Sequence, residues 1–269
     1  MYIHLSVIIP FYNSGNFIYE ALESIKKYCG QYNYETIIIN DGSDDEKSLG
    51  ILDELEETSE YIIIHQSNKG PGAARNAGCR IAKGEFLFFL DSDNKIKPEY
   101  IDKALTVLET QKDIGVVYSK AIPFGDKSRK SFVTNSFDIQ SLLASNYIDM
   151  CSFIRKAVWQ DVNGFDEDTR ICSIEDWDLW LCIYEKGWDF FFIDEPLFFY
   201  RIRSESLMGT ETKLSTHKDR IAYLYAKHSK LLVKYYPKLL TTSLIYAEDK
   251  KRPFRSLLKY LLYKFQNNN

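Results

Sequence analysis

Aspartates separated by one residue occur three times in this chain, and such a pair can hold a hard divalent cation through its carboxylate oxygens. The three pairs are Asp91/Asp93, Asp166/Asp168 and Asp176/Asp178. Only Asp91-Ser92-Asp93 follows an apolar run, Phe86 to Leu90, which predicts a position at the tip of a buried strand. A hard cation could bind at such a tip, but on this pattern alone a turn with two solvated carboxylates is the favoured interpretation, because acidic turn residues are common.

Asp41 also ends an apolar run, within the sequence Asn40-Asp41-Gly42-Ser43. Its carboxylate could accept hydrogen bonds from a base or a ribose. Alternatively, Asp41 only shapes the turn, while Ser43 or Asp44 caps the next helix. The spacing alone favours neither interpretation.

Two predicted helices begin with residues that could take part in chemistry. The Gly-Pro-Gly sequence at 70–72 predicts a helix start ahead of Arg75, where free backbone amides and the guanidinium could face an anion; a solvated Arg75 is the alternative. Ser173 and Asp176 fit the Ser/Thr-x-x-Asp/Glu capping pattern, which needs no chemistry. An ionised carboxylate there would also be a competent base. Trp177 is expected in the core more readily than as a sugar platform.

Short apolar runs alternate with helical patterns between these residues. The predicted strands are Leu5–Ile9, Thr36–Ile39, Tyr61–Ile64, Phe86–Leu90 and Gly115–Tyr118, and the predicted helices between them are Phe17–Tyr28, Leu49–Leu55, Ala73–Ala82 and Pro98–Leu108. Such a series predicts an α/β fold with a mostly parallel sheet between helices. In such a sheet, ligands bind at the carboxyl ends of the strands, where the polar groups above are expected to meet.

The alternation weakens past residue 120. The segment from Pro123 to Asn135 is polar and predicts a loop. The remaining predicted elements are short helices around Leu142, Val158 and Trp180, strand-like runs at Phe190–Ile193 and Leu197–Tyr200, and a helical, basic segment from Thr212, with leucines at 257, 258, 261 and 262 at helical spacing.

Composition excludes several classes of protein. The 269 residues are 45% hydrophobic and 27% charged, which suits a compact globular protein. The five cysteines show no CxxC or CxH spacing, so neither a disulfide framework nor a zinc site is expected, and a reducing cytosol is the expected compartment. No signal-peptide pattern and no run of about 20 apolar residues occurs. Neither GxGxxG after the first strand nor a P-loop motif is present.

The net charge of −4 conceals an asymmetry along the chain. Residues 1–212 hold 21 basic and 35 acidic residues, whereas residues 213–269 hold 13 and 3. The basic segment could lie on an anionic membrane, pack on the body, or support self-association into a homo-oligomer. Nucleic acid is not an expected partner, because the body is acidic and no recognition motif occurs.

Taken in order, the motifs resemble those of family 2 glycosyltransferases. They are Ser6 to Asn13, Asn40 to Ser43, Asn68 to Gly70, Ala74 to Gly78, Asp91 to Asp93, Asn163 to Glu167, and Glu175-Asp176. Each piece is weak, but the ordered set is specific, and it covers about residues 1–205. The resemblance implies a GT-A fold, a nucleotide-sugar donor, a divalent cation (Mn²⁺ or Mg²⁺) and inversion at the anomeric carbon.

The resemblance also implies roles for individual residues. The nucleoside pocket would be lined by Pro10, Tyr12 and Asp41. The rest of the donor site would hold Arg75, Asp91, Ser92 and Asp93, with Asp93 as the metal ligand. Asp176 would be the general base, and the acceptor would meet Glu175 and Trp177.

Two departures from the family pattern matter. Asn40 stands where the family often has Asp, although Asp41 is kept. Family members often carry a His two residues after the Arg of a Tyr-Arg pair, where this chain has Arg203. Any metal contact by that His is lost. Arg203 either binds the diphosphate directly or is a solvated charge, and the sequence leaves both open.

The resemblance therefore implies an inverting glycosyltransferase that moves a hexosyl or N-acetylhexosaminyl group, with a UDP-sugar as the first expectation, to a saccharide or lipid-linked acceptor. The predicted GT-A domain spans 1–211, with a nucleotide-sugar-binding half (1–120) and an acceptor-binding half (121–211), followed by a basic helical extension (212–269). The expected location is cytoplasmic, with peripheral contact at the inner membrane face. The alternatives are a nucleotidyltransferase that makes a sugar nucleotide and a non-catalytic nucleotide-binding module on the same fold.

Overall fold

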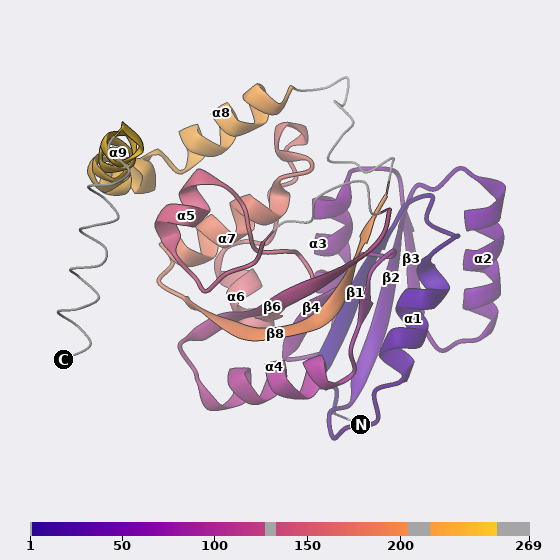
Figure 1. Ribbon diagram of the computed structural model, residues 1–269. Coiled ribbons are helices and arrows are strands. Elements are labelled where there is room, and N and C mark those ends of the chain that lie inside the picture. The colour runs from indigo at the N-terminus through magenta and orange to yellow at the C-terminus, as the bar shows by residue number, and fades with distance from the viewer. Residues whose placement is uncertain (1, 127–132, 204–215, 252–269) are drawn as a thin grey trace. The chain divides into compact units, whose positions relative to one another are not determined.

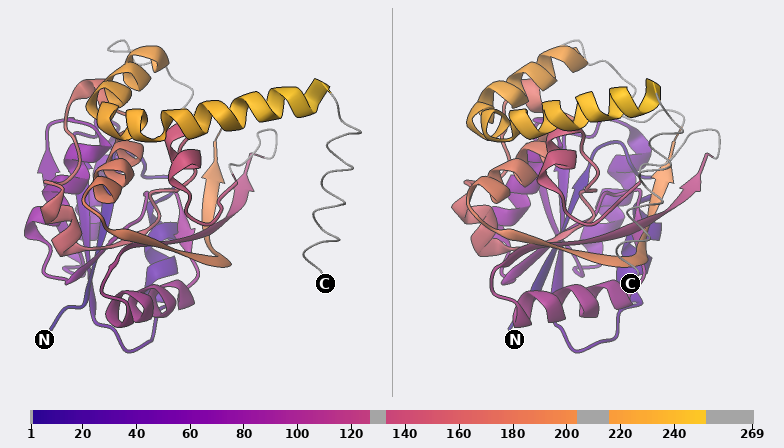
Figure 2. Two further views of the ribbon diagram at one scale, coloured as in Figure 1. Left: turned by 90° about the vertical axis from the view of Figure 1, so that its left-hand side faces the viewer. Right: turned by 60° about the vertical axis from the view of Figure 1, so that its left-hand side comes forward.

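A computed structural model describes residues 2–126, 133–203 and 216–251. Those up to residue 224 form an eight-stranded sheet with helices packed on it (Figure 1). The sheet is curled. Two long strands near one edge run at a steep angle to the other strands, as both views of Figure 2 show. The chain divides into two compact units, Met1–Leu224 and Tyr225–Asn269. The predicted domain boundary at 211/212 lies outside the described residues and stays a prediction.

The strand order is β3-β2-β1-β4-β7-β6-β8-β5. Strands β1 to β4 pair in parallel, β7 is antiparallel to both of its neighbours, and the long pair β6 and β8 is parallel. The strands are β1 (Leu5–Phe11), β2 (Tyr34–Asp41), β3 (Ile62–Gln66), β4 (Phe86–Phe89), β5 (Lys95–Ile96), β6 (Ile114–Gly125), β7 (Phe153–Arg155) and β8 (Asp189–Ile202). The expected mostly parallel α/β sheet is confirmed.

The structure corrects three details of the predicted strands. The short strands β5 and β7 were not predicted, and the two aromatic runs after residue 189 form one strand, β8. The predicted loop from Pro123 is wrong for its first three residues, since Pro123–Gly125 end β6 and pair with Tyr200–Ile202 of β8.

Helices cover both faces of the parallel part of the sheet. In β1, Val7 and Ile9 belong to the core that also contains residues of the helices on one face, whereas Ile8 points to α3 on the other face. A Cβ at Gly78 of α3 would lie 2.8 Å from side-chain atoms of Ile8 and Ile39, so glycine allows the close approach of this helix. The helices of the first unit are α1 (Ile18–Lys26), α2 (Glu46–Glu57), α3 (Pro71–Ile81), α4 (Glu99–Thr110), α5 (Ile139–Ala144), α6 (Lys156–Asp161), the 3-10 helix η1 (Thr169–Ile171), α7 (Glu175–Glu185) and most of α8 (His217–Lys227).

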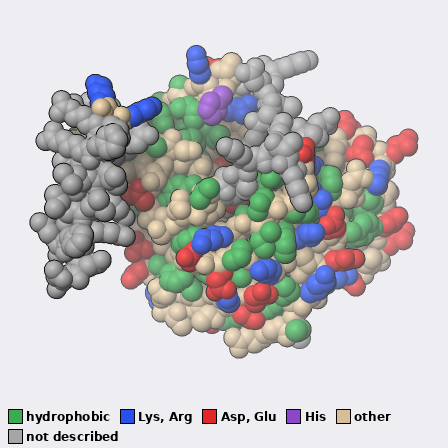
Figure 3. All heavy atoms as spheres, viewed as in Figure 1, with side chains coloured by type: hydrophobic (Ala, Val, Ile, Leu, Met, Phe, Trp, Pro, Cys, Tyr) green, Lys and Arg blue, Asp and Glu red, His purple; other side chains and the backbone are tan. Residues whose placement is uncertain are grey.

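Exposed acidic side chains gather along α2, at the right-hand edge of Figure 3. They include Asp53, Glu54, Glu56 and Glu57. These residues account for part of the excess of acidic over basic residues in 1–212, and they lie away from the strand tips.

Two predicted helix caps are wrong. The side chain of Asp45, rather than Ser43 or Asp44, caps α2 by accepting a hydrogen bond from the Ser48 backbone N–H at 2.9 Å. Ser173 does not cap α7: Ile174 precedes the helix, and Ser173 adopts a positive φ of 74°. The capping pattern therefore does not account for Asp176.

The second unit is described as far as residue 251. Helix α9 (Ser229–Lys251) contains Pro237. Among the helices that the structure describes, none is long and apolar enough to cross a membrane. The leucines at 257, 258, 261 and 262 lie outside the described residues.

Candidate active site

Arg75 lies at the centre of a buried ion-pair cluster that joins three elements. Arg75 comes from α3, Asp91 follows β4, and Glu175 begins α7. Arg75 Nη2 donates to Asp91 Oδ1 at 2.8 Å and Nη1 to Glu175 Oε1 at 2.7 Å, and the Arg75 side chain is 5% exposed. Burial lowers the pKa of Arg75, but the two carboxylates outweigh it and the net shift is upward. Arg75 is therefore a fixed buried charge, and the alternative of a solvated Arg75 is wrong.

Asp93 lies two residues past Asp91 and pairs with Arg203, which follows β8. Arg203 Nε is 3.2 Å from Asp93 Oδ2, and the guanidinium carbon lies 5.2 Å from the centre of the Phe17 ring. Burial, with the charge of Asp91 as a second cause, raises the pKa of Asp93 to about 6 although Arg203 is nearby. Arg203 is thus an ion-paired residue rather than a solvated charge, and Asp93 would still gain from more positive charge.

The surroundings of Asp93 fit a divalent cation. Hard cations such as Mg²⁺ prefer carboxylate and phosphate oxygens. Asp93 Oδ2 contacts Arg203, and the Asp93 side chain is 20% exposed, so a ligand can still reach the carboxylate. Asp91 is less available, because its Oδ1 accepts from Arg75. The chain therefore offers Asp93 as one carboxylate ligand.

Asp176 is held in place by hydrogen bonds to both of its carboxylate oxygens. Oδ1 accepts from the backbone N–H of Trp177 at 2.7 Å, and Oδ2 accepts from Asn146 Nδ2 at 2.8 Å. Burial raises the pKa of Asp176 to about 7, and the charge of Glu175 adds to the shift. A half-buried carboxylate with a pKa near neutrality can take a proton from a hydroxyl group at physiological pH.

The structure adds Asp149 to the site, a residue that sequence reasoning missed. Its Oδ1 accepts from the Cys151 backbone N–H at 2.8 Å. Burial, followed by the charges of Asp91 and then Asp176, raises the pKa of Asp149 to about 8. Tyr200 lies close enough that burial and then Asp149 raise its phenol pKa as well. Apart from its polar surroundings, the sequence around Asp149 carries no motif that points to a site.

Asp41 is 4% exposed and organises the loop after β3. Its Oδ1 accepts from Gln66 Nε2 at 2.7 Å and from the Lys69 backbone N–H at 2.9 Å, and its Oδ2 accepts from the Gly70 N–H at 2.8 Å. These bonds fix the chain that leads into α3. Asp41 thus shapes the loop at 66–70, whereas in its own turn Asn40 Oδ1 accepts from the Ser43 backbone N–H at 2.9 Å. The predicted contact of Asp41 with a base stays a prediction.

The other predicted residues take different positions. Pro10 is half-buried near the end of β1, and Tyr12 is 43% exposed just after it. Ser92 is buried between the two aspartates. Trp177 is 6% exposed, and its Nε1 donates to the Leu142 carbonyl at 2.6 Å, so its indole packs behind the start of α7.

Asn76 explains why two of the motifs belong together. Its Oδ1 accepts from the Phe165 backbone N–H at 2.9 Å and from Trp159 Nε1 at 3.0 Å, and its Nδ2 donates to the Phe165 carbonyl. Gly164 has a positive φ of 76°, and a Cβ there would lie 2.5 Å from Asn76 Oδ1. Buried hydrogen bonds thus join two motifs next to Arg75, the Arg-Asn-Ala-Gly segment of α3 and the Asn-Gly-Phe-Asp segment.

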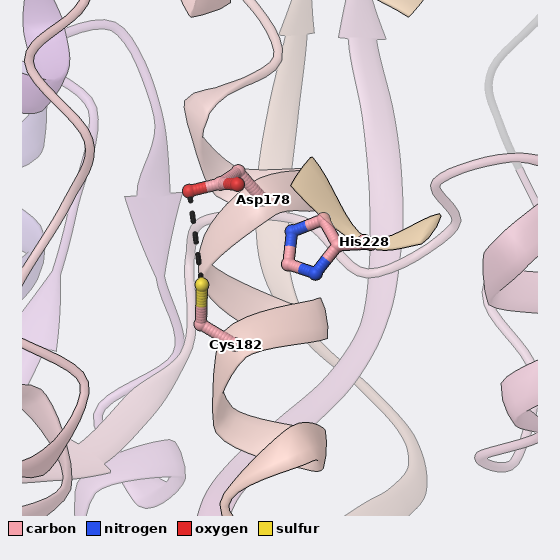
Figure 4. A group of neighbouring side chains, drawn as sticks. All are labelled: Asp178, Cys182 and His228. Atoms are coloured by element: carbon pink, nitrogen blue, oxygen red, sulfur yellow. Dashed lines mark hydrogen bonds between the residues drawn. The ribbon is translucent and has the colours of Figure 1, made fainter. Parts of the chain in front are cut away.

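In the other two aspartate pairs, the second residue of each makes a local contact within its own element. Asp178 is 1% exposed and accepts from Cys182 Sγ, one turn along α7, over 3.9 Å (Figure 4). Asp168 caps η1 by accepting from the Arg170 backbone N–H at 2.9 Å. Of the three pairs, Asp91/Asp93 is the one placed at a strand tip beside Arg75.

A strand-tip acidic pair, a buried Arg and a hydrogen-bonded carboxylate thus lie near one another in this α/β fold. The sequence matches the family described as Glycosyl transferase family 2 over residues 6–168, which is more than half of the chain. This chain belongs to glycosyl transferase family 2.

The chain is also similar to individual members of the class. It is 28% identical over 251 residues to glycosyltransferase GlyG of Streptococcus pneumoniae, covering 84% of this chain and 79% of that protein. It is 29% identical to an uncharacterized glycosyltransferase of Haemophilus influenzae, covering 83% and 77%. The crystal structure of S. aureus TarS 1–349 has a TM-score of 0.61 and 25% identity, covering 74% of this chain and 60% of TarS 1–349. The GT-A fold is confirmed.

Proposed function

We propose that this chain is an inverting glycosyltransferase that moves a hexosyl or N-acetylhexosaminyl group from a UDP-sugar to a hydroxyl of a saccharide or lipid-linked saccharide. The observation that carries the proposal is Asp176, a base with a pKa near 7 held beside the cluster of Arg75, Asp91 and Glu175.

Two similarities support the donor and the pathway class. A structure of S. aureus TarS 1–349 in complex with UDP-GlcNAc has a TM-score of 0.64 with 21% identity and covers 84% of this chain and 72% of TarS 1–349. A poly(ribitol-phosphate) beta-glucosyltransferase of Bacillus spizizenii is 28% identical over 208 residues, 68% of this chain and 33% of that protein. The first supports a UDP-sugar donor, and the second supports a role in polysaccharide synthesis.

In the proposed reaction, Asp176 accepts the proton of the acceptor hydroxyl as that oxygen forms a bond to the anomeric carbon. The bond from this carbon to the diphosphate breaks on the opposite face, and its electron pair leaves with the nucleotide. Asn146 holds Asp176 Oδ2, so the base keeps its orientation. A divalent cation on Asp93 would stabilise the negative charge of the leaving diphosphate.

The acceptor is expected beside Glu175. Its Oε1 is paired with Arg75, whereas its Oε2 is buried without a hydrogen-bond partner among the described residues. Buried polar atoms are normally satisfied, so this oxygen favours a ligand hydroxyl as its partner. Trp177 supports this position from behind, and Pro10, Tyr12, Asp41 and Ser92 are proposed to line the rest of the donor site.

The test has two stages. Thermal unfolding with UDP, GDP, dTDP and CMP, each with and without Mn²⁺, identifies the nucleotide by its stabilisation of the native state. UDP release from UDP-sugars is then measured in wild type and in Asp176→Asn. A variant that retains activity would remove Asp176 from the mechanism. Pyrophosphate release from a nucleoside triphosphate would favour the nucleotidyltransferase alternative, and binding without turnover would favour the binding module.

We also propose that the basic extension lies on anionic membrane. On α9, Val233 and Tyr236 are 73% and 60% exposed, and they share one side of the helix with the exposed Leu240. Exposed lysines at 230, 234 and 238 form the neighbouring row. This arrangement suits an apolar face in the interface beside lysines near headgroups. Sedimentation with phosphatidylglycerol vesicles, but not with phosphatidylcholine vesicles, is expected, and equal sedimentation would contradict it.

A further inference from the structure

Two arginines near the end of β8 meet the segment after β4 in different ways. Arg201 donates hydrogen bonds to other groups of the protein: its Nε donates to the Asp93 carbonyl at 2.9 Å, and its Nη2 donates to Glu20 at 2.7 Å. Arg203 makes one polar contact, from Nε to Asp93 Oδ2. Among the described residues, no hydrogen-bond acceptor meets Arg203 Nη1 or Nη2. Arg203 therefore keeps two donors for a ligand.

The position of Arg203 is nevertheless well defined. Asp93 holds one edge of the guanidinium, and the ring of Phe17 packs against it with a distance of 5.2 Å from the guanidinium carbon. The Arg203 side chain is 30% exposed, so its free nitrogens can be reached from solvent. A planar guanidinium with two free N–H groups matches the geometry of phosphate oxygens.

The same contact affects cation binding at Asp93. A divalent cation that approaches Asp93 meets the positive charge of Arg203, and one carboxylate oxygen is already engaged. Conversely, the guanidinium of Arg203 already places a positive charge beside Asp93, where a diphosphate can meet it before any cation binds. Asp93 can thus position an arginine for the diphosphate in addition to acting as a metal ligand.

We propose that Arg203, positioned by Asp93, binds the donor diphosphate directly, so that the nucleotide binds in the absence of a divalent cation. This inference rests on the proposed nucleotide-sugar donor. On this proposal the cation acts in the bond-breaking step, whereas side chains of the protein hold the nucleotide.

The test measures UDP affinity by calorimetry in EDTA and in Mn²⁺ for the full chain. For wild type we expect dissociation constants within about threefold of each other in the two buffers. For Arg203→Ala we expect a loss of roughly 10- to 100-fold in EDTA, since charge-assisted hydrogen bonds are lost, and a much smaller loss in Mn²⁺. Arg203→Lys keeps the positive charge but lacks the paired N–H donors of a planar guanidinium, so it should recover part of the UDP affinity measured in EDTA.

Arg80→Ala is the matched control. Arg80 forms an exposed ion pair with Glu167 at 2.7 Å, outside the proposed machinery, so its loss should leave both affinities unchanged. Unfolding of each variant without ligand verifies that the fold is intact.

A second measurement does not involve nucleotide. Binding of Mn²⁺ alone, followed by electron paramagnetic resonance, should become at least severalfold tighter in Arg203→Ala, because the competing charge at Asp93 is gone. Unchanged Mn²⁺ affinity would contradict the competition.

The outcomes separate this inference from the proposed function. Wild-type binding of UDP in Mn²⁺ but not in EDTA overturns the inference and leaves the nucleotide donor intact. Equal EDTA affinities of wild type and Arg203→Ala also overturn it. Absence of UDP binding in both buffers overturns the inference and the proposed UDP-sugar donor together.

Discussion

Replacement of Arg75 by Met should strongly destabilise the first unit. The Arg75 and Glu175 side chains are 5% and 7% exposed, and Asp91 is 32% exposed, so Arg75→Met leaves a buried and a partly buried carboxylate without their cation. Removing one partner of a buried pair costs about 3–5 kcal/mol. At about 2–4 °C per kcal/mol for a protein of this size, the melting temperature should fall by roughly 10 °C.

Urea unfolding of single and double variants tests the origin of this loss. Glu175→Gln in the Arg75→Met background removes the uncompensated charge, so the double variant should regain part of the stability, and the cycle gives the coupling between the two residues. Arg80→Met is the control, because its exposed ion pair with Glu167 is worth only about 0–1 kcal/mol. If Arg75→Met costs no more than Arg80→Met, the buried cluster does not hold α3 to α7.

Three further predictions concern carboxylates of the site. Asp176→Asn should lower kcat by about 10²- to 10⁴-fold while UDP affinity, measured by calorimetry, stays unchanged. Wild-type kcat/KM should fall on acidification with a midpoint near pH 7, and Asn146→Ala should move this midpoint to higher pH, because Asn146 donates to the ionised form of Asp176. Asp149, with a pKa of about 8 when folded, retains a proton that the unfolded chain releases above about pH 4, so its contribution to stability is lost as pH rises toward 8. Asp149→Asn should therefore raise the melting temperature relative to wild type more at pH 8 than at pH 5, and an equal difference at both values would contradict the buried-charge argument.

The sequence predicted the fold best where strands are buried on both faces. Strand β4 reads Phe-Leu-Phe-Phe, and all four residues are buried, so an apolar run and a strand coincide. Strands β5 and β7 have two and three residues, too few for any periodicity. Pro123 and Gly125 indicated a loop, but they lie at the end of β6, where pairing with β8 extends the strand.

The candidate site was predictable where it depends on local sequence. Asp91 and Asp93 follow β4 directly, and Arg75 lies just inside a helix that begins with Pro, so a pattern placed all three near strand tips. Asn146 and Asp149 could not be found in this way. They lie about 30 residues from Asp176 in a segment of short elements, and their relation to this proposed base arises from tertiary packing.

Asp176 shows why a capping motif and a catalytic site are hard to distinguish by sequence. An acidic residue in the first turn of a helix is stabilised in its ionised form by the positive end of the helix dipole, whatever its function. Here the predicted partner Ser173 turns away with a positive φ, and Asp176 Oδ1 accepts from Trp177 N–H instead. Burial and Glu175 raise the pKa of Asp176 to about 7, although that bond and Arg75 lower it, and a value near 7 suits the proposed base. The proposed chemistry therefore depends on how deeply α7 begins inside the protein, a property of packing that the Ser-x-x-Asp spacing does not encode.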